Sequence, residues 1–119
     1  MPYLIGRHPF LKLKVKFPKK GNWETIECLI DTGFSGGLVL PLSTKINFPN
    51  NEFIEARFLM ADNSEITVDA TFTLVEYSGK KKEVAVVFMG DNQGLVGVEF
   101  LDQMKFCLDL KKNMVKLYS

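Results

Sequence analysis

The chain has 119 residues, enough for one folded domain and too few for two of ordinary size, so we expect one domain spanning residues 1–119. It is 46% hydrophobic and 24% charged, which is typical of a folded protein and excludes a largely disordered one. The formal net charge of +1 gives no reason to expect binding to nucleic acid or to an anionic membrane. No leader pattern and no apolar run of about 20 residues is present, so we expect a cytoplasmic protein.

The cysteine and histidine content argues against a metal site. Cys28 and Cys107 both fall in strand-like segments, and we expect two buried free thiols in preference to a disulfide. With His8 as the single histidine, they do not make a convincing set of metal ligands, so we expect neither a metal nor a cofactor. The lysine run at 80–82 is expected at a charged hairpin tip that keeps a strand edge soluble.

The first part of the chain predicts a β-hairpin. Residues 10–17 (FLKLKVKF) alternate apolar and basic side chains, which indicates a half-buried strand. Residues 18–22 supply turn chemistry, and residues 24–30 (ETIECLI) return as a second strand. Residues 38–48 (LVLPLSTKINF) predict a short strand followed by one helical turn. The side chains expected to point inward are Leu11, Leu13, Val15 and Phe17 on the first strand and Ile26, Cys28 and Ile30 on the second.

The remainder also consists mainly of predicted strands. Residues 52–77 predict two strands around a tight turn at 61–64, and residues 83–89 (EVAVVFM) predict a central strand. Residues 98–104 predict a short helix, and the chain then closes with a last hairpin around 111–113. The strand that returns from the turn is expected to carry an apolar face of Ile66, Val68, Ala70, Phe72 and Leu74. Together these elements predict a mostly β fold, a small closed or partly open barrel with one or two short helices.

One stretch places an acidic residue among apolar and small residues. Residues 27–41 read ECLIDTGFSGGLVLP, so Asp31 ends a strand that looks buried and precedes Thr32 and Gly33. As a turn residue, Asp31 would accept hydrogen bonds from nearby backbone N–H groups, and Gly33 would supply an unusual backbone angle. Alternatively, a carboxylate at the end of a core strand is desolvated, and chemistry is a reason to keep such a costly group.

Three motifs then occur in a recognisable order. They are Leu29-Ile30-Asp31-Thr32-Gly33, the hairpin tip at 61–64, and Leu95-Val96-Gly97 followed by the predicted short helix. This order resembles that of the retropepsin-like aspartic proteases of clan AA, and most closely their short single-domain bacterial and archaeal members. The resemblance covers about residues 10–118. It implies a barrel of the retropepsin type with a flap hairpin above the Asp-Thr-Gly loop.

The resemblance also implies an activity and a set of site residues. The activity is aspartic endopeptidase hydrolysis of peptide bonds by a water molecule that paired Asp31 carboxylates activate. Because the chain has a single Asp-Thr-Gly, the second carboxylate must come from another copy, so the resemblance implies a homodimer. Thr32 would hydrogen-bond to the partner loop, and Gly33 would offer its carbonyl to a peptide substrate. The other residues implied to bind substrate are Phe34, Ser35, Gly36, Ala61, Asp62, Asn63, Ser64, Leu95, Val96 and Gly97.

Two departures and two alternatives accompany this resemblance. Viral members carry an acidic residue at the position of Ser35 and an arginine at that of Val98, so the loop must be supported differently here. One alternative is a catalytically silent domain that binds extended peptides. The other is a structural or assembly domain in which Asp31 only orders its loop. A silent domain should tolerate Asp31→Asn, whereas an enzyme should not.

Overall fold

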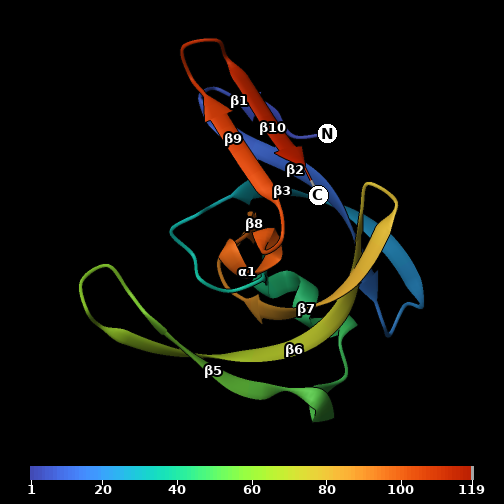
Figure 1. Ribbon diagram of the computed structural model, residues 1–119. Coiled ribbons are helices and arrows are strands. Elements are labelled where there is room, and N and C mark those ends of the chain that lie inside the picture. Colours follow the sequence, from blue (N-terminus) through green and yellow to red (C-terminus); the bar gives the residue numbers. More distant parts are fainter. Residues whose placement is uncertain (119) are drawn as a thin grey trace.

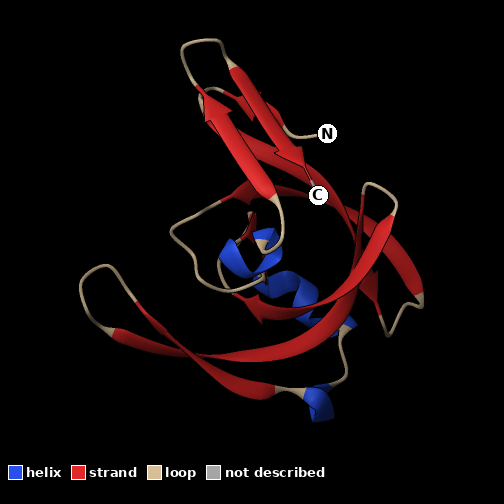
Figure 2. Cartoon of the chain, viewed as in Figure 1, coloured by secondary structure: helices blue, strands red, loops and turns tan. Residues whose placement is uncertain are grey.

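Strands dominate the computed structural model, which describes residues 1–118 (Figure 1). The mostly β class predicted from the sequence is confirmed (Figure 2). The strands are β1 (Tyr3–Ile5), β2 (His8–Phe17), β3 (Asn22–Ile30), β4 (Leu38–Leu40), β5 (Ile54–Leu59), β6 (Glu65–Tyr77), β7 (Lys80–Phe88), β8 (Gly94–Val96), β9 (Lys105–Asp109) and β10 (Met114–Tyr118). The helices are the 3₁₀ helices η1 (Leu42–Asn47) and η2 (Asn50–Glu52) and the α-helix α1 (Val98–Leu101).

Eight strands form one curved sheet in the order β1-β2-β3-β8-β4-β7-β6-β5 (Figure 1). Most neighbours are antiparallel, but β3 runs parallel to β8 and β4 runs parallel to β7. In addition, β6 pairs with β2 through Lys14↔Glu76 and Val15↔Val75. A strand near one end of the sheet is thus also hydrogen-bonded to a strand near the other end. The hairpin β9–β10 forms a separate two-stranded sheet.

The main apolar core lies on the inner side of this sheet. The alternation predicted for residues 10–17 is confirmed, because Leu11, Leu13 and Val15 are fully buried and Phe17 is nearly so. On β3, Cys28 and Ile30 are buried on the same face. The core is completed by Leu38, Leu40, Phe48, Val75, Val84, Val86, Phe88, Val96, Phe100 and Leu101. Burial of these side chains is the main stabilising term for the fold.

The apolar face expected on β6 is present, but it is not the face that packs into the main core. Phe72 is 54% exposed and Leu74 is 43% exposed, whereas Thr71, Thr73 and Val75 on the opposite face are buried. The Thr73 hydroxyl donates a hydrogen bond to the carbonyl of Lys16 at 2.7 Å, which satisfies its polar group inside the structure. Alternation therefore predicted the strand correctly but did not show which face is buried.

The helical segments are short and differ slightly from the prediction. Three of them occur in the described residues, where one or two were expected. Helix α1 falls in the predicted range and buries Phe100 and Leu101, whereas Val98 is 48% exposed. Within residues 1–118, no helix is both long enough and apolar enough to span a bilayer.

The two cysteines lie in different environments. Neither forms a disulfide in the described structure, and Cys28 is buried as expected. Cys107 is exposed, so the expectation of two buried thiols is wrong for it. Cys107 shares the outward face of the hairpin β9–β10 with Lys116, its direct partner across the strand pair. An isolated two-stranded hairpin can bury only one of its faces. A strand-like sequence therefore does not by itself show that a given residue of the hairpin is buried.

Thiol labelling tests this difference. At about pH 8 we expect iodoacetamide to modify Cys107 and to leave Cys28 unmodified in the folded protein. Burial raises the pKa of the Cys28 thiol to about 12, so it stays protonated and unreactive at that pH. Peptide mass spectrometry with and without denaturant measures both sites. Rapid modification of Cys28 without denaturant would contradict its placement in the core.

Candidate functional site

Parallel pairing brings two of the sequence motifs together at the end of the sheet. Strand β3 leads directly into Asp31, and strand β8 leads directly into Gly97. The two strands run side by side, with Leu29 opposite Leu95 and Ile30 opposite Val96. The ladder continues past the strand ends, because the Asp31 N–H donates to the Val96 carbonyl at 2.9 Å. Asp31 and Gly97 therefore each follow directly after one of two paired strands.

The Asp31 loop is a tight turn ordered by its own carboxylate. The Gly33 N–H donates to Asp31 Oδ1 at 2.9 Å, and the Phe34 N–H donates to the Asp31 carbonyl at 3.1 Å. Asp31 is partly buried, and Thr32 and Gly33 are exposed. The carboxylate thus lies at the surface of this single chain and is not enclosed by it.

Gly97 lies where the two loops touch. A Cβ atom at Gly97 would lie 2.4 Å from the Gly36 carbonyl oxygen and 2.5 Å from that of Phe34, so no larger residue fits without moving the backbone. Three backbone hydrogen bonds connect the loops here: Gly97 N–H to Gly37 at 3.0 Å, Val98 N–H to Phe34 at 2.8 Å, and Glu99 N–H to Gly36 at 3.1 Å. The loop that contains Asp31 is therefore held by main-chain groups.

A second apolar cluster covers the sheet beside this loop. Val39, Ala70 and Val87 are buried in it, and Phe34 and Phe58 pack together with ring centroids 5.3 Å apart. Phe58 belongs to β5, so the arm of the hairpin β5–β6 contacts the Asp31 loop directly. The other partly buried members of the cluster are Ala56, Val68, Met89 and Leu95.

The turn between β5 and β6 spans the predicted tip at 61–64. Asn63 adopts a positive φ of 68°, and its N–H donates to the Met60 carbonyl at 3.0 Å. Asp62 Oδ1 accepts a hydrogen bond from the Ser64 N–H at 2.9 Å and another from the Ser64 hydroxyl, and these bonds lower the pKa of the Asp62 carboxyl. All four tip residues are exposed. In Figure 1 the tip (green) projects on the same side of the view as the Asp31 loop (cyan).

Sequence reasoning missed two residues beside this loop. Phe58 was read only as part of a strand, although it contacts Phe34. Glu99 was predicted only as part of a helix, although its N–H donates to the Gly36 carbonyl of the Asp31 loop and the residue lines a hollow next to that loop. The partner of a side chain depends on which strands pair, and a local pattern contains no information about this. No local signal in the sequence identifies either residue.

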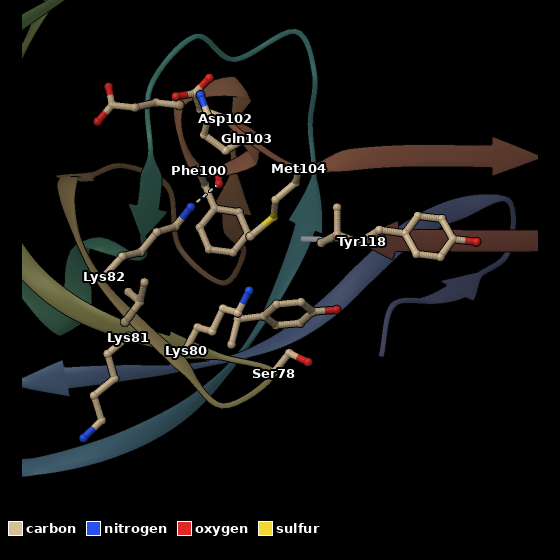
Figure 3. A pocket seen from close by; sticks show the side chains of 13 residues that line it. Ser78, Lys80, Lys81, Lys82, Phe100, Asp102, Gln103, Met104 and Tyr118 are labelled. Carbon is tan, nitrogen blue, oxygen red and sulfur yellow. Dashed lines mark hydrogen bonds between the residues drawn. The ribbon is translucent and has the colours of Figure 1, made fainter.

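A larger hollow lies elsewhere, between the β6–β7 turn, α1 and the end of β10 (Figure 3). Its volume is about 720 Å³, and none of the predicted site residues lines it. Lys82, expected at an exposed tip, points across this hollow, donates to the Phe100 carbonyl and lies 4.4 Å from the Phe100 ring (Figure 3). Burial lowers the pKa of Lys82. These contacts give Lys82 a structural role at the end of α1.

Comparison with known proteins adds no assignment. No family model matches the sequence, and no curated protein matches it. Among residues 1–118, no group of three or more histidine, cysteine, aspartate or glutamate side chains is arranged to hold a metal ion. The functional interpretation therefore depends on the geometry around Asp31.

Replacement of Gly97 by alanine tests the packing of the two loops. We expect Gly97→Ala to lower the free energy of unfolding by about 1–3 kcal/mol, because the added methyl group must displace backbone carbonyls. Urea unfolding measures the change, and Ser35→Ala, an exposed position in the same loop, serves as the control. Equal stability of Gly97→Ala and the wild type would contradict the close approach seen at Gly97.

Proposed function

We propose that the chain is a retropepsin-like aspartic endopeptidase that acts as a homodimer. The observation that carries the proposal is the arrangement around Asp31: its loop packs backbone to backbone on the Gly97 loop, and the Phe34–Phe58 contact joins it to the hairpin β5–β6. The return of β6 to β2 supports the barrel form of this fold. The three motifs that suggested the family in the sequence are thus consistent with one connected site.

The dimer follows from the chemistry of this class of enzyme. Aspartic proteolysis uses two carboxylates that share one proton, one as the base for a water molecule and the other as a donor to the peptide carbonyl. The chain has a single Asp-Thr-Gly, so Asp31 of a second copy supplies the other carboxylate. The partial exposure of Asp31 in one chain leaves it accessible to such a partner.

The neighbouring residues take complementary roles in this proposal. Thr32 and Gly33 are exposed next to Asp31, where Thr32 hydrogen-bonds to the partner loop and Gly33 offers its carbonyl to the substrate. The substrate lies extended, with alternate side chains against the apolar cluster that contains Phe34 and Leu95. The tip at 61–64 closes over the substrate and excludes water.

Ser35 and Val98 replace the acidic residue and the arginine of the viral pattern, so the ion pair between those two side chains is absent here. Ser35 is exposed, and Val98 is half exposed. The backbone hydrogen bond from Val98 N–H to the Phe34 carbonyl connects the same two segments that the ion pair would connect. Loop support by main-chain groups is therefore compatible with the proposed enzyme.

One observation favours a second candidate, a silent peptide-binding domain of the same fold. The Asp31 carboxylate accepts the Gly33 N–H, which is also what a residue that only orders its loop would do. Such a domain would bind an extended peptide on the same apolar cluster without cleaving it. The proposed enzyme and the silent domain differ in whether the charge of Asp31 is required.

A matched pair of proteins tests the proposal. We incubate wild type and Asp31→Asn with a peptide library from about pH 4 to pH 7 and detect cleavage by mass spectrometry. We expect cleavage by wild type, sensitive to a hydroxyl-bearing transition-state mimic such as pepstatin, and a loss of at least about 1,000-fold in Asp31→Asn, because an amide cannot act as the base.

Sedimentation of both proteins provides the control, because the substitution must leave the dimer and the fold intact. Cleavage at equal rates by both proteins would exclude catalysis by Asp31. A wild-type dimer that binds peptides and cleaves none would favour the silent domain.

A further inference from the structure

A small hollow lies directly beside the Asp31 loop. Its volume is about 250 Å³, below the range of about 300–1,000 Å³ that holds a whole small-molecule ligand, so it suits a single side chain. The loop segment 34–38 forms one wall, and strands β5, β6 and β7 form the other. The hollow therefore lies between the proposed catalytic loop and the base of the proposed flap.

The lining of this hollow is mainly aromatic and apolar, and its polar side chains belong to Ser35 and Glu99. Phe34, Phe58 and Phe72 contribute three aromatic rings, and Phe72 is 54% exposed although it lies next to a buried cluster. Among the described residues that line the hollow, Glu99 is the one ionisable residue.

The backbone of Glu99 is held against the Asp31 loop. Its N–H donates to the Gly36 carbonyl at 3.1 Å, and Gly36 is itself part of the hollow. Glu99 also lines the larger hollow that contains Lys82, and Asp102 and Glu99 both act electrostatically on Lys82, whose ammonium group donates to the Phe100 carbonyl. The Glu99 side chain is exposed, so its carboxylate can accept a further cation from a bound peptide.

We propose that this hollow binds a lysine or arginine side chain of the substrate and that Glu99 determines this preference. The aliphatic stem would lie against the faces of Phe34, Phe58 and Phe72, and the cationic head would reach the Glu99 carboxylate. An aliphatic residue would contact the same walls but would bring no further cation to the Glu99 carboxylate. The inference depends on the proposed function for the orientation of the substrate. The hollow and the presence of Glu99 in its lining do not depend on that function.

Paired peptides that differ at one position test this inference. Each pair carries lysine or norleucine at the same distance from the cleaved bond, and the ratio of kcat/KM is measured for wild type, Glu99→Gln and Glu99→Lys. We expect wild type to prefer lysine about three- to fivefold at one position, because the Glu99 carboxylate is exposed to solvent. Glu99→Gln should reduce the ratio to about one, and Glu99→Lys should invert it in favour of norleucine, because two cations would then repel each other.

Glu55→Gln is the matched control, because Glu55 is exposed on β5 and does not line the hollow. Added salt should weaken the lysine preference of wild type. An equal lysine-to-norleucine ratio in wild type and Glu99→Gln would overturn the proposal.

The proposal can also be tested if no peptide is cleaved. Fluorescence anisotropy then measures binding of the same labelled peptides to wild type and Glu99→Gln. If wild type binds the lysine peptide more tightly and Glu99→Gln does not, the result would support a cation-binding hollow even though the protease proposal fails. Equal affinity for lysine and norleucine peptides in wild type would overturn the inference itself.

Discussion

Backbone-to-backbone packing of the Asp31 loop on the Gly97 loop is the constraint on which the rest of the site depends. A side-chain carbon at Gly97 would lie 2.4 Å from the Gly36 carbonyl oxygen, so the contact requires glycine. The hydrogen bonds from Gly97 and Val98 to Gly37 and Phe34 then fix the loop. Main-chain bonds of this kind carry no titratable group, so the position of Asp31 is maintained whatever the protonation state of neighbouring side chains.

This packing also orients the surroundings of Asp31. With the loop fixed, the Phe34 ring lies against Phe58 and connects the loop to the arm of the hairpin β5–β6. The chain that leaves Gly97 enters α1, which brings Glu99 back to Gly36. Direct contacts therefore connect the Asp31 loop, the second apolar cluster and the hollow that Glu99 lines, and the proposed active site requires preorganisation of this kind.

The sequence predicted the positions of the strands well, but it did not predict which segments distant in the chain contact one another. Alternation identified a strand at 10–17, within the observed strand His8–Phe17, and its buried face, because one face of that strand packs fully into the core. It failed to show that Thr71 and Thr73, rather than Phe72 and Leu74, are buried, since the apolar face of β6 continues from the second cluster onto the surface. Asp31 and Gly97 were identifiable from short motifs. Glu99 and Phe58 were not, because their importance arises from the pairing of distant strands.

The most direct test of the central claim is to add inactive chains to active ones. Wild type is held at a constant concentration, and Asp31→Asn is added in increasing excess at total concentrations where sedimentation shows dimers. If each active site needs two Asp31 carboxylates, cleavage per wild-type chain falls towards zero, because wild-type chains enter mixed dimers with a single carboxylate. Cleavage per wild-type chain that stays constant while mixed dimers form would contradict the account, since a single chain would then contain a complete site.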